Sequence, residues 1–132
     1  MTRLLVSLLI LFPGAGTSRT QLTVVTETGS VSSSLRSSQA TLRCDANKVR
    51  GTGYLRTRAK QACRLVSKGA VQRVERAQQS RRFCSQIYGG PQRAHITGQI
   101  GRQRVDLTIT RTDGCGTADW YALQTLLGNP ER

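Results

Sequence analysis

The stretch RAHITGQIGRQRVDLTITR, Arg93–Arg111, shows most directly which kind of fold this chain adopts. Apolar side chains alternate with polar ones on both sides of a central glycine, a period of two that is typical of strands with one face against a core. The tetrad Ile100-Gly101-Arg102-Gln103 between the two runs can form a turn. The stretch therefore predicts a β-hairpin. Its core-facing residues are Ala94, Ile96, Val105, Leu107 and Ile109.

Two earlier segments have strand character, and each is followed by a segment with loop character. Leu22–Thr28 is rich in β-branched residues, and Gln39–Cys44 alternates apolar and polar residues, so both are predicted strands. Gly29–Ser38 is rich in serine, and Asp45–Gly53 is polar with two glycines, so both are predicted loops.

Helical spacing begins in the middle of the chain. Leu55–Lys68 repeats apolar residues at spacings of 4, 3 and 4, and Gly69 marks the end of this predicted helix. Ala70–Gln79 has weaker helical spacing. A last helix is expected with Thr117 as its N-cap and Gly128 at its end. Strands and helices in separate short pieces predict an α+β fold around an antiparallel sheet.

The first 18 residues have the order of a secretory signal peptide. Arg3 supplies the positive charge, Leu4–Phe12 is an apolar run interrupted only by Ser7, and small residues follow. This run is far shorter than the roughly 20 residues of a membrane-spanning helix, so we expect no transmembrane segment in the mature protein. The alternative is a buried N-terminal strand. We expect cleavage between Ala15 and Arg19, which leaves a secreted domain over residues 19–132.

Four cysteines, Cys44, Cys63, Cys84 and Cys115, fit the chemistry of a small exported domain. An even number in such a domain indicates two disulfides, with three pairings open at this point. Structural zinc sites need close ligand pairs such as C-x-x-C, whereas successive cysteines here are 19, 21 and 31 residues apart. We therefore expect disulfides, and neither a metal nor another cofactor.

The chain is strongly basic, with 20 Lys and Arg against 7 Asp and Glu and a net charge of +13. The segment Arg43–Arg82 contains twelve basic and two acidic residues and so carries +10 by itself. Such a charge attracts anionic polymers, acidic proteins and anionic surfaces. Stacking aromatics and nucleic-acid-binding motifs are nearly absent, so we expect a solvated basic face rather than specific recognition of nucleic acid. An i, i+4 row of this face is formed by Arg56, Lys60, Arg64 and Lys68.

Sequence patterns of common enzymes are missing. The chain has no G-x-S-x-G, no H-E-x-x-H and no glycine-rich phosphate loop. Its one histidine, His95, lies in a predicted strand, and Asp106 should point away from the apolar face of its own strand. With no candidate base near a candidate nucleophile, we expect a protein that is not an enzyme.

The segment FCSQIYGGP, Phe83–Pro91, places a cysteine before an irregular stretch and a Gly-Gly-Pro turn after it. Together with QLTVVTETG, ATLRCD, GTGYL, ACRLV and TGQIGRQRVDLTITRTDGCGTADW, it resembles the subtilisin inhibitor-like family of secreted bacterial serine-protease inhibitors. The resemblance extends over residues 20–127 and rests on the order of the cysteines and their flanks. It implies a five-stranded antiparallel sheet with two or three helices, two disulfides joining Cys44–Cys63 and Cys84–Cys115, and a homodimer packed through the sheet.

The resemblance also implies a reactive peptide bond between the second and third residues after the third cysteine. Here that bond is Gln86–Ile87, so Gln86 is the residue that enters the primary specificity pocket of a subtilisin-like protease. The remaining residues of the implied protease-contacting loop are Phe83, Cys84, Ser85 and Tyr88.

Three features depart from the family pattern. Gln86 replaces the usual methionine or lysine, and because trypsin demands a cation there, trypsin should be a poor target. Subtilisin-like enzymes accept varied residues at this position and favour a bulky residue where Phe83 lies. Ser85 replaces a frequent proline and Gly89-Gly90-Pro91 replaces a shorter turn, and both changes should loosen the loop. The alternative function is a secreted basic module of the same fold that docks on anionic surfaces or partners, with weak or no inhibition.

Overall fold

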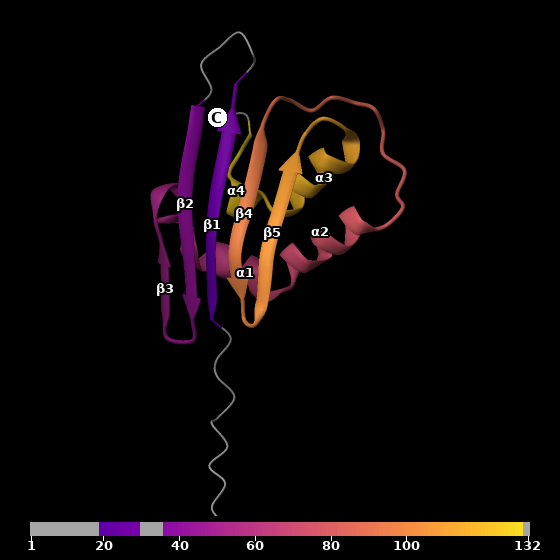
Figure 1. Ribbon diagram of the computed structural model, residues 1–132. Helices are drawn as coiled ribbons and strands as arrows, with labels where there is room; N and C mark the ends of the chain where they lie inside the picture. Colours follow the sequence, from indigo (N-terminus) through magenta and orange to yellow (C-terminus); the bar gives the residue numbers. More distant parts are fainter. Residues whose placement is uncertain (1–18, 30–35, 131–132) are drawn as a thin grey trace, which may run out of the picture.

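The computed structural model describes residues 19–29 and 36–130, which form a five-stranded antiparallel sheet with helices on one side (Figure 1). The expected signal peptide, residues 1–18, lies outside the described residues, as do residues 30–35 of the expected Gly29–Ser38 loop. The order across the sheet is β3-β2-β1-β4-β5. The strands are β1 (Thr20–Thr28), β2 (Arg36–Asp45), β3 (Lys48–Gly51), β4 (Arg93–Ile100) and β5 (Gln103–Thr110).

The predicted α+β class, the five-stranded antiparallel sheet and both disulfide pairings are confirmed. The predicted hairpin is β4–β5, with Ile100 opposite Gln103 across a two-residue turn. Gly101 has φ 61° there, and a type II′ turn requires a positive φ at this first central position. One disulfide joins the end of β2 to the first helix, and the other joins the segment after the second helix to the third.

One face of the sheet packs on the helices and forms the core. Alternating apolar residues of the four longer strands are buried there, as their period of two predicts. The opposite face carries polar side chains, and in the described residues no helix covers it (Figure 1). The core-facing strand residues are Leu22, Val24, Ala40, Leu42, Ala94, Ile96, Val105, Leu107 and Ile109.

Two segments in the middle of the chain differ from the sequence-based predictions. Strand β3 lies within Asp45–Gly53, which the sequence predicts to be a loop, because its polar residues pair with β2 instead of burying an apolar face. The predicted helix Leu55–Lys68 is shorter: the N–H groups of Arg56 and Arg58 bond the carbonyls three residues earlier, so a 3-10 turn precedes the helix. The elements are η1 (Gly53–Leu55), α1 (Ala59–Ser67) and α2 (Ala70–Gln79).

The last helix also starts elsewhere than predicted. Asp113, not Thr117, is the N-cap of α3 (Gly114–Ala122), and its carboxylate accepts a hydrogen bond of 2.8 Å from the Gly116 N–H. The reason is that Asp113 is still extended, so helical geometry begins at Gly114. The Thr117 hydroxyl instead donates to the Asp113 carbonyl inside the first turn. Leu123 interrupts the helix, and α4 (Gln124–Leu127) follows.

Candidate functional site

The segment that connects α2 to β4 contains the predicted protease-contacting loop and has no regular secondary structure from Arg81 to Gly90. Three of its large apolar side chains lie in solvent: Phe83 is fully exposed, Ile87 is 73% exposed and Tyr88 is 63% exposed. Few other large apolar side chains among the described residues are exposed. Large apolar side chains exposed on one short segment make this segment the candidate partner-contacting surface among the described residues.

The N-terminal side of the loop is attached to the start of α3. The Cys84–Cys115 disulfide brings the two Cα atoms to 5.1 Å, and the Gly114 N–H donates a hydrogen bond of 2.8 Å to the Ser85 carbonyl. A Cβ atom at Gly114 would lie within 2.1 Å of the Ser85 hydroxyl oxygen. The absence of a side chain at Gly114 therefore leaves room for the Ser85 side chain against the start of α3.

The C-terminal side of the loop is attached to the end of β5. The Gly89 N–H donates a hydrogen bond of 2.7 Å to the Arg111 carbonyl. A Cβ atom at Gly89 would lie 2.3 Å from the Thr117 hydroxyl oxygen, closer than a real Cβ contact allows. The Gly89-Gly90 pair, which the sequence suggests loosens the loop, thus supplies a close contact at its first residue.

Between these two attachments the backbone is free. Within the described part of the chain, Gln86, Ile87 and Tyr88 make no backbone–backbone hydrogen bond, and the Gln86 side chain reaches back 3.4 Å to the Cys84 carbonyl. The Gln86–Ile87 peptide bond is therefore exposed and available for pairing with an incoming strand.

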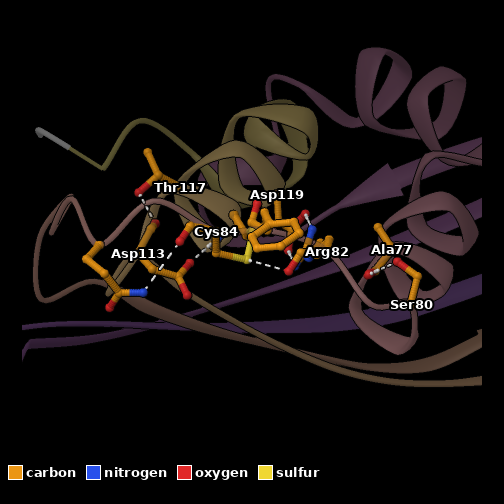
Figure 2. Close-up of a disulfide and its surroundings, with 11 residues drawn as sticks. Ala77, Ser80, Arg82, Cys84, Asp113, Thr117 and Asp119 are labelled. Atoms are coloured by element: carbon orange, nitrogen blue, oxygen red, sulfur yellow. Dashed lines mark hydrogen bonds and ion pairs between the residues drawn. A yellow bond between two sulfur atoms is a disulfide. The ribbon is translucent and has the colours of Figure 1, made fainter.

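An ion pair at the start of the loop was not foreseen from the sequence. The Arg82 guanidinium donates two parallel hydrogen bonds, of 2.9 and 2.7 Å, to the carboxylate of Asp119 on α3 (Figure 2). The Arg82 side chain is 28% exposed and the Asp119 side chain only 7%. The hydrogen bond to Asp119 raises the pKa of Arg82. Since 37 residues separate the two along the chain, no local sequence pattern signals this pair.

Arg111 is a second unforeseen support, and it is buried beneath the loop. Its Nη1 donates a hydrogen bond of 2.8 Å to the Gln92 side chain, and its guanidinium lies 5.8 Å from the centre of the Tyr121 ring. Gln92 in turn donates to the Pro130 carbonyl at 2.8 Å. Arg111 therefore connects the end of β5 to the segment after the loop and to α3.

The predicted basic row is only partly on one helix. Lys60 and Arg64 lie on α1, whereas Arg56 precedes the helix and Lys68 follows it, and all four side chains are exposed. The expectation of a single row along one helix is wrong in this respect, because the 3-10 turn replaces the first helical turn.

Two other groups of polar residues resemble parts of a metal site and of a catalytic site, but each lacks a necessary group. Cys84, Asp113 and Cys115 lie close together, but both sulfur atoms are in the disulfide and cannot bind a metal as thiolates. His95 Nε2 lies 2.6 Å from an Asp106 carboxylate oxygen on the polar face of the sheet. Among the described residues, no hydroxyl or thiol is hydrogen-bonded to this His–Asp pair.

Comparison of the chain with protein-family models and with curated proteins yields no match. Every helix in the described part of the chain is too short or too polar to span a bilayer.

Proposed function

We propose that this protein is a secreted inhibitor of subtilisin-like serine proteases, with Gln86–Ile87 as its reactive bond. One observation carries the proposal: both sides of an exposed peptide bond are attached to the same short segment, Arg111–Asp119. The N-terminal side is held by the disulfide, by Gly114 and by Asp119, and the C-terminal side is held by the Arg111 carbonyl.

The mechanism follows from this attachment. The extended loop adds itself as a strand to the protease cleft, while exposed side chains such as Phe83 fill pockets. The Gln86 carbonyl then occupies the oxyanion hole, and the catalytic serine attacks it. The bond to the Ile87 nitrogen breaks, and an amine is released. Because Gly89 remains hydrogen-bonded to Arg111, this amine stays next to the acyl group and re-forms the bond.

Preorganisation of the loop is the reason that we expect it to bind a protease tightly. A flexible substrate loses conformational freedom when it binds, whereas a loop already held at Ser85 and Gly89 loses little. The two disulfides favour an oxidising compartment, which agrees with the proposed secretion. The uncovered polar face of the sheet leaves room for the homodimer that the family resemblance implies.

An inhibition assay tests the proposal directly. The protein from residue 19 onward is expected to inhibit subtilisin, and Gln86→Lys is expected to add trypsin inhibition because trypsin binds a cation in its primary pocket. Gln103→Lys, an equal charge change at the exposed first residue of β5, is the matched control and should leave trypsin active. The proposal is refuted if micromolar protein leaves subtilisin active, or if the loop is cut quickly and released. If only the trypsin result fails, the assignment of Gln86 is wrong.

A further inference from the structure

The helical side of the molecule carries a second feature, which does not depend on the inhibitor function. Its outward surface is covered by exposed cations from α1, α2 and their junction. Among the described residues, none of these side chains has a carboxylate oxygen within 4.0 Å; the ion pairs there involve Arg19, Arg82 and His95. We call this surface the basic face; it consists of Lys60, Arg64, Lys68, Arg73 and Arg76.

The cations of each helix stand three or four residues apart, so they are neighbours along the helix surface, and Arg73 and Lys68 meet at the α1–α2 junction. The Arg73 guanidinium folds back and donates a hydrogen bond of 2.6 Å to the Lys68 carbonyl. Glu75 is the only acidic residue in α1 and α2, and it is half-buried. Unpaired like charges so close together repel each other, and a bound polyanion relieves that repulsion.

A groove leads away from this junction between α1 and the end of β2. It has a volume of about 610 Å³, and Lys60 and Arg64 line it together with Ser67 and Gln72. Asp45 also lines the groove, but its carboxylate lies 3.7 Å from the Arg19 guanidinium, which offsets its charge. Lys60 and Arg64 therefore bring positive charge to the groove.

The chemistry of this face selects among anionic partners. Insertion into a lipid surface needs several exposed apolar side chains, but of the large ones that the structure describes only Val49 of β3 lines the groove, and Phe83 and Tyr121 lie on other elements. Single-stranded nucleic acid is held by stacking on aromatic rings, and neither α1 nor α2 contains one. We propose that the basic face binds a linear, phosphate-rich polymer through charge alone, with Lys60 and Arg64 holding it at the groove.

Such a partner would leave the inhibitory loop accessible. Lys60 and Arg64 lie on α1, under the β2 side of the sheet, whereas the loop runs along the β5 side next to α3 (Figure 1). The protein can thus bind a polymer with one part and a protease with another.

Binding of inorganic polyphosphate at several salt concentrations tests the proposal. Four contacting cations give a slope of log affinity against log salt of about −2.8, at roughly 0.7 per phosphate contact on a flexible chain. Raising salt from about 50 to 200 mM should then weaken binding about 50-fold. The test variant is Lys60→Gln/Arg64→Gln/Lys68→Gln/Arg76→Gln, which retains Arg73 and its bond to Lys68.

The matched control removes four exposed cations elsewhere: Arg43→Gln/Arg50→Gln/Arg93→Gln/Arg104→Gln. We expect the control to keep most of the affinity and the slope, and the basic-face variant to lose both. Circular dichroism confirms that each variant is folded. Equal losses in the two variants, absence of polyphosphate binding at low salt, or preferential binding to anionic phosphatidylglycerol vesicles would each overturn the proposal.

Discussion

Replacing Gly89 by alanine tests whether the C-terminal attachment of the loop controls inhibition. The added Cβ would lie 2.3 Å from the Thr117 hydroxyl oxygen and 3.2 Å from the Arg111 carbonyl. Thr117 is β-branched and its hydroxyl is bonded to Asp113, so it cannot move aside freely. The loop must shift instead, and overpacking of this kind costs about 1–3 kcal/mol. We expect Gly89→Ala to weaken subtilisin inhibition by about 5- to 150-fold.

Two measurements separate this effect from a general loss of stability. The inhibition constant is measured with a chromogenic peptide substrate, and cleavage at Gln86–Ile87 is followed by mass spectrometry. Faster cleavage is expected in Gly89→Ala, because the released amine of Ile87 is no longer held in place. Thermal unfolding should show a smaller change, since the substitution lies in a loop outside the core.

A second substitution tests whether contact with Thr117 causes the loss of inhibition in Gly89→Ala. Thr117→Ala removes the hindering oxygen, so Gly89→Ala/Thr117→Ala should recover most of the inhibition, although the Arg111 carbonyl still crowds the new methyl group. Thr117→Ala alone is the control and should cost about 1 kcal/mol of stability for its lost hydrogen bond. If Gly89→Ala inhibits like the unmodified protein, or if removal of the Thr117 hydroxyl brings no recovery, contact between Gly89 and Thr117 does not control inhibition.

Two further predictions concern the supports and the core. Arg82→Ala should lower the free energy of unfolding by about 3 kcal/mol in chemical denaturation, because it leaves a buried carboxylate unpaired. Arg82→Ala/Asp119→Asn should recover part of this loss, and an unchanged stability of the single variant would contradict a structural role for the pair. Burial raises the pKa of Tyr54 to about 12 in the folded protein, above its usual value near 10. The folded state therefore holds the phenol proton more tightly than the unfolded state does, and loss of this proton favours unfolding. Stability should therefore fall between pH 10 and pH 12 in thermal unfolding, and less so in Tyr54→Phe; equal pH dependence in both proteins would exclude Tyr54 as the cause.

The buried faces of the four longer strands followed from local sequence patterns. Residues such as Ile96 and Leu107 alternate with polar neighbours because one face of each strand is buried, and this burial leaves a period of two in the sequence. The sequence of strand β3 shows no such alternation, because the strand pairs with β2 by hydrogen bonds and buries little apolar surface. The start of α1 was also hidden, because a 3-10 turn and an α-helix place Leu55 on the same buried side.

The antiparallel α+β class and the buried strand faces are written in the sequence as periods of apolar residues, whereas the bond at Gln86–Ile87 is a prediction from the family resemblance. Only the tertiary structure decided what holds that bond: the Arg82–Asp119 ion pair, the Gly89–Arg111 hydrogen bond and the close approach of Gly114 to the loop. Apolar residues that repeat with the period of a strand or a helix indicate which side of that one element is buried. These supports instead join residues more than 20 positions apart, and the chain brings them together only when the β5–α3 connection packs beneath the loop.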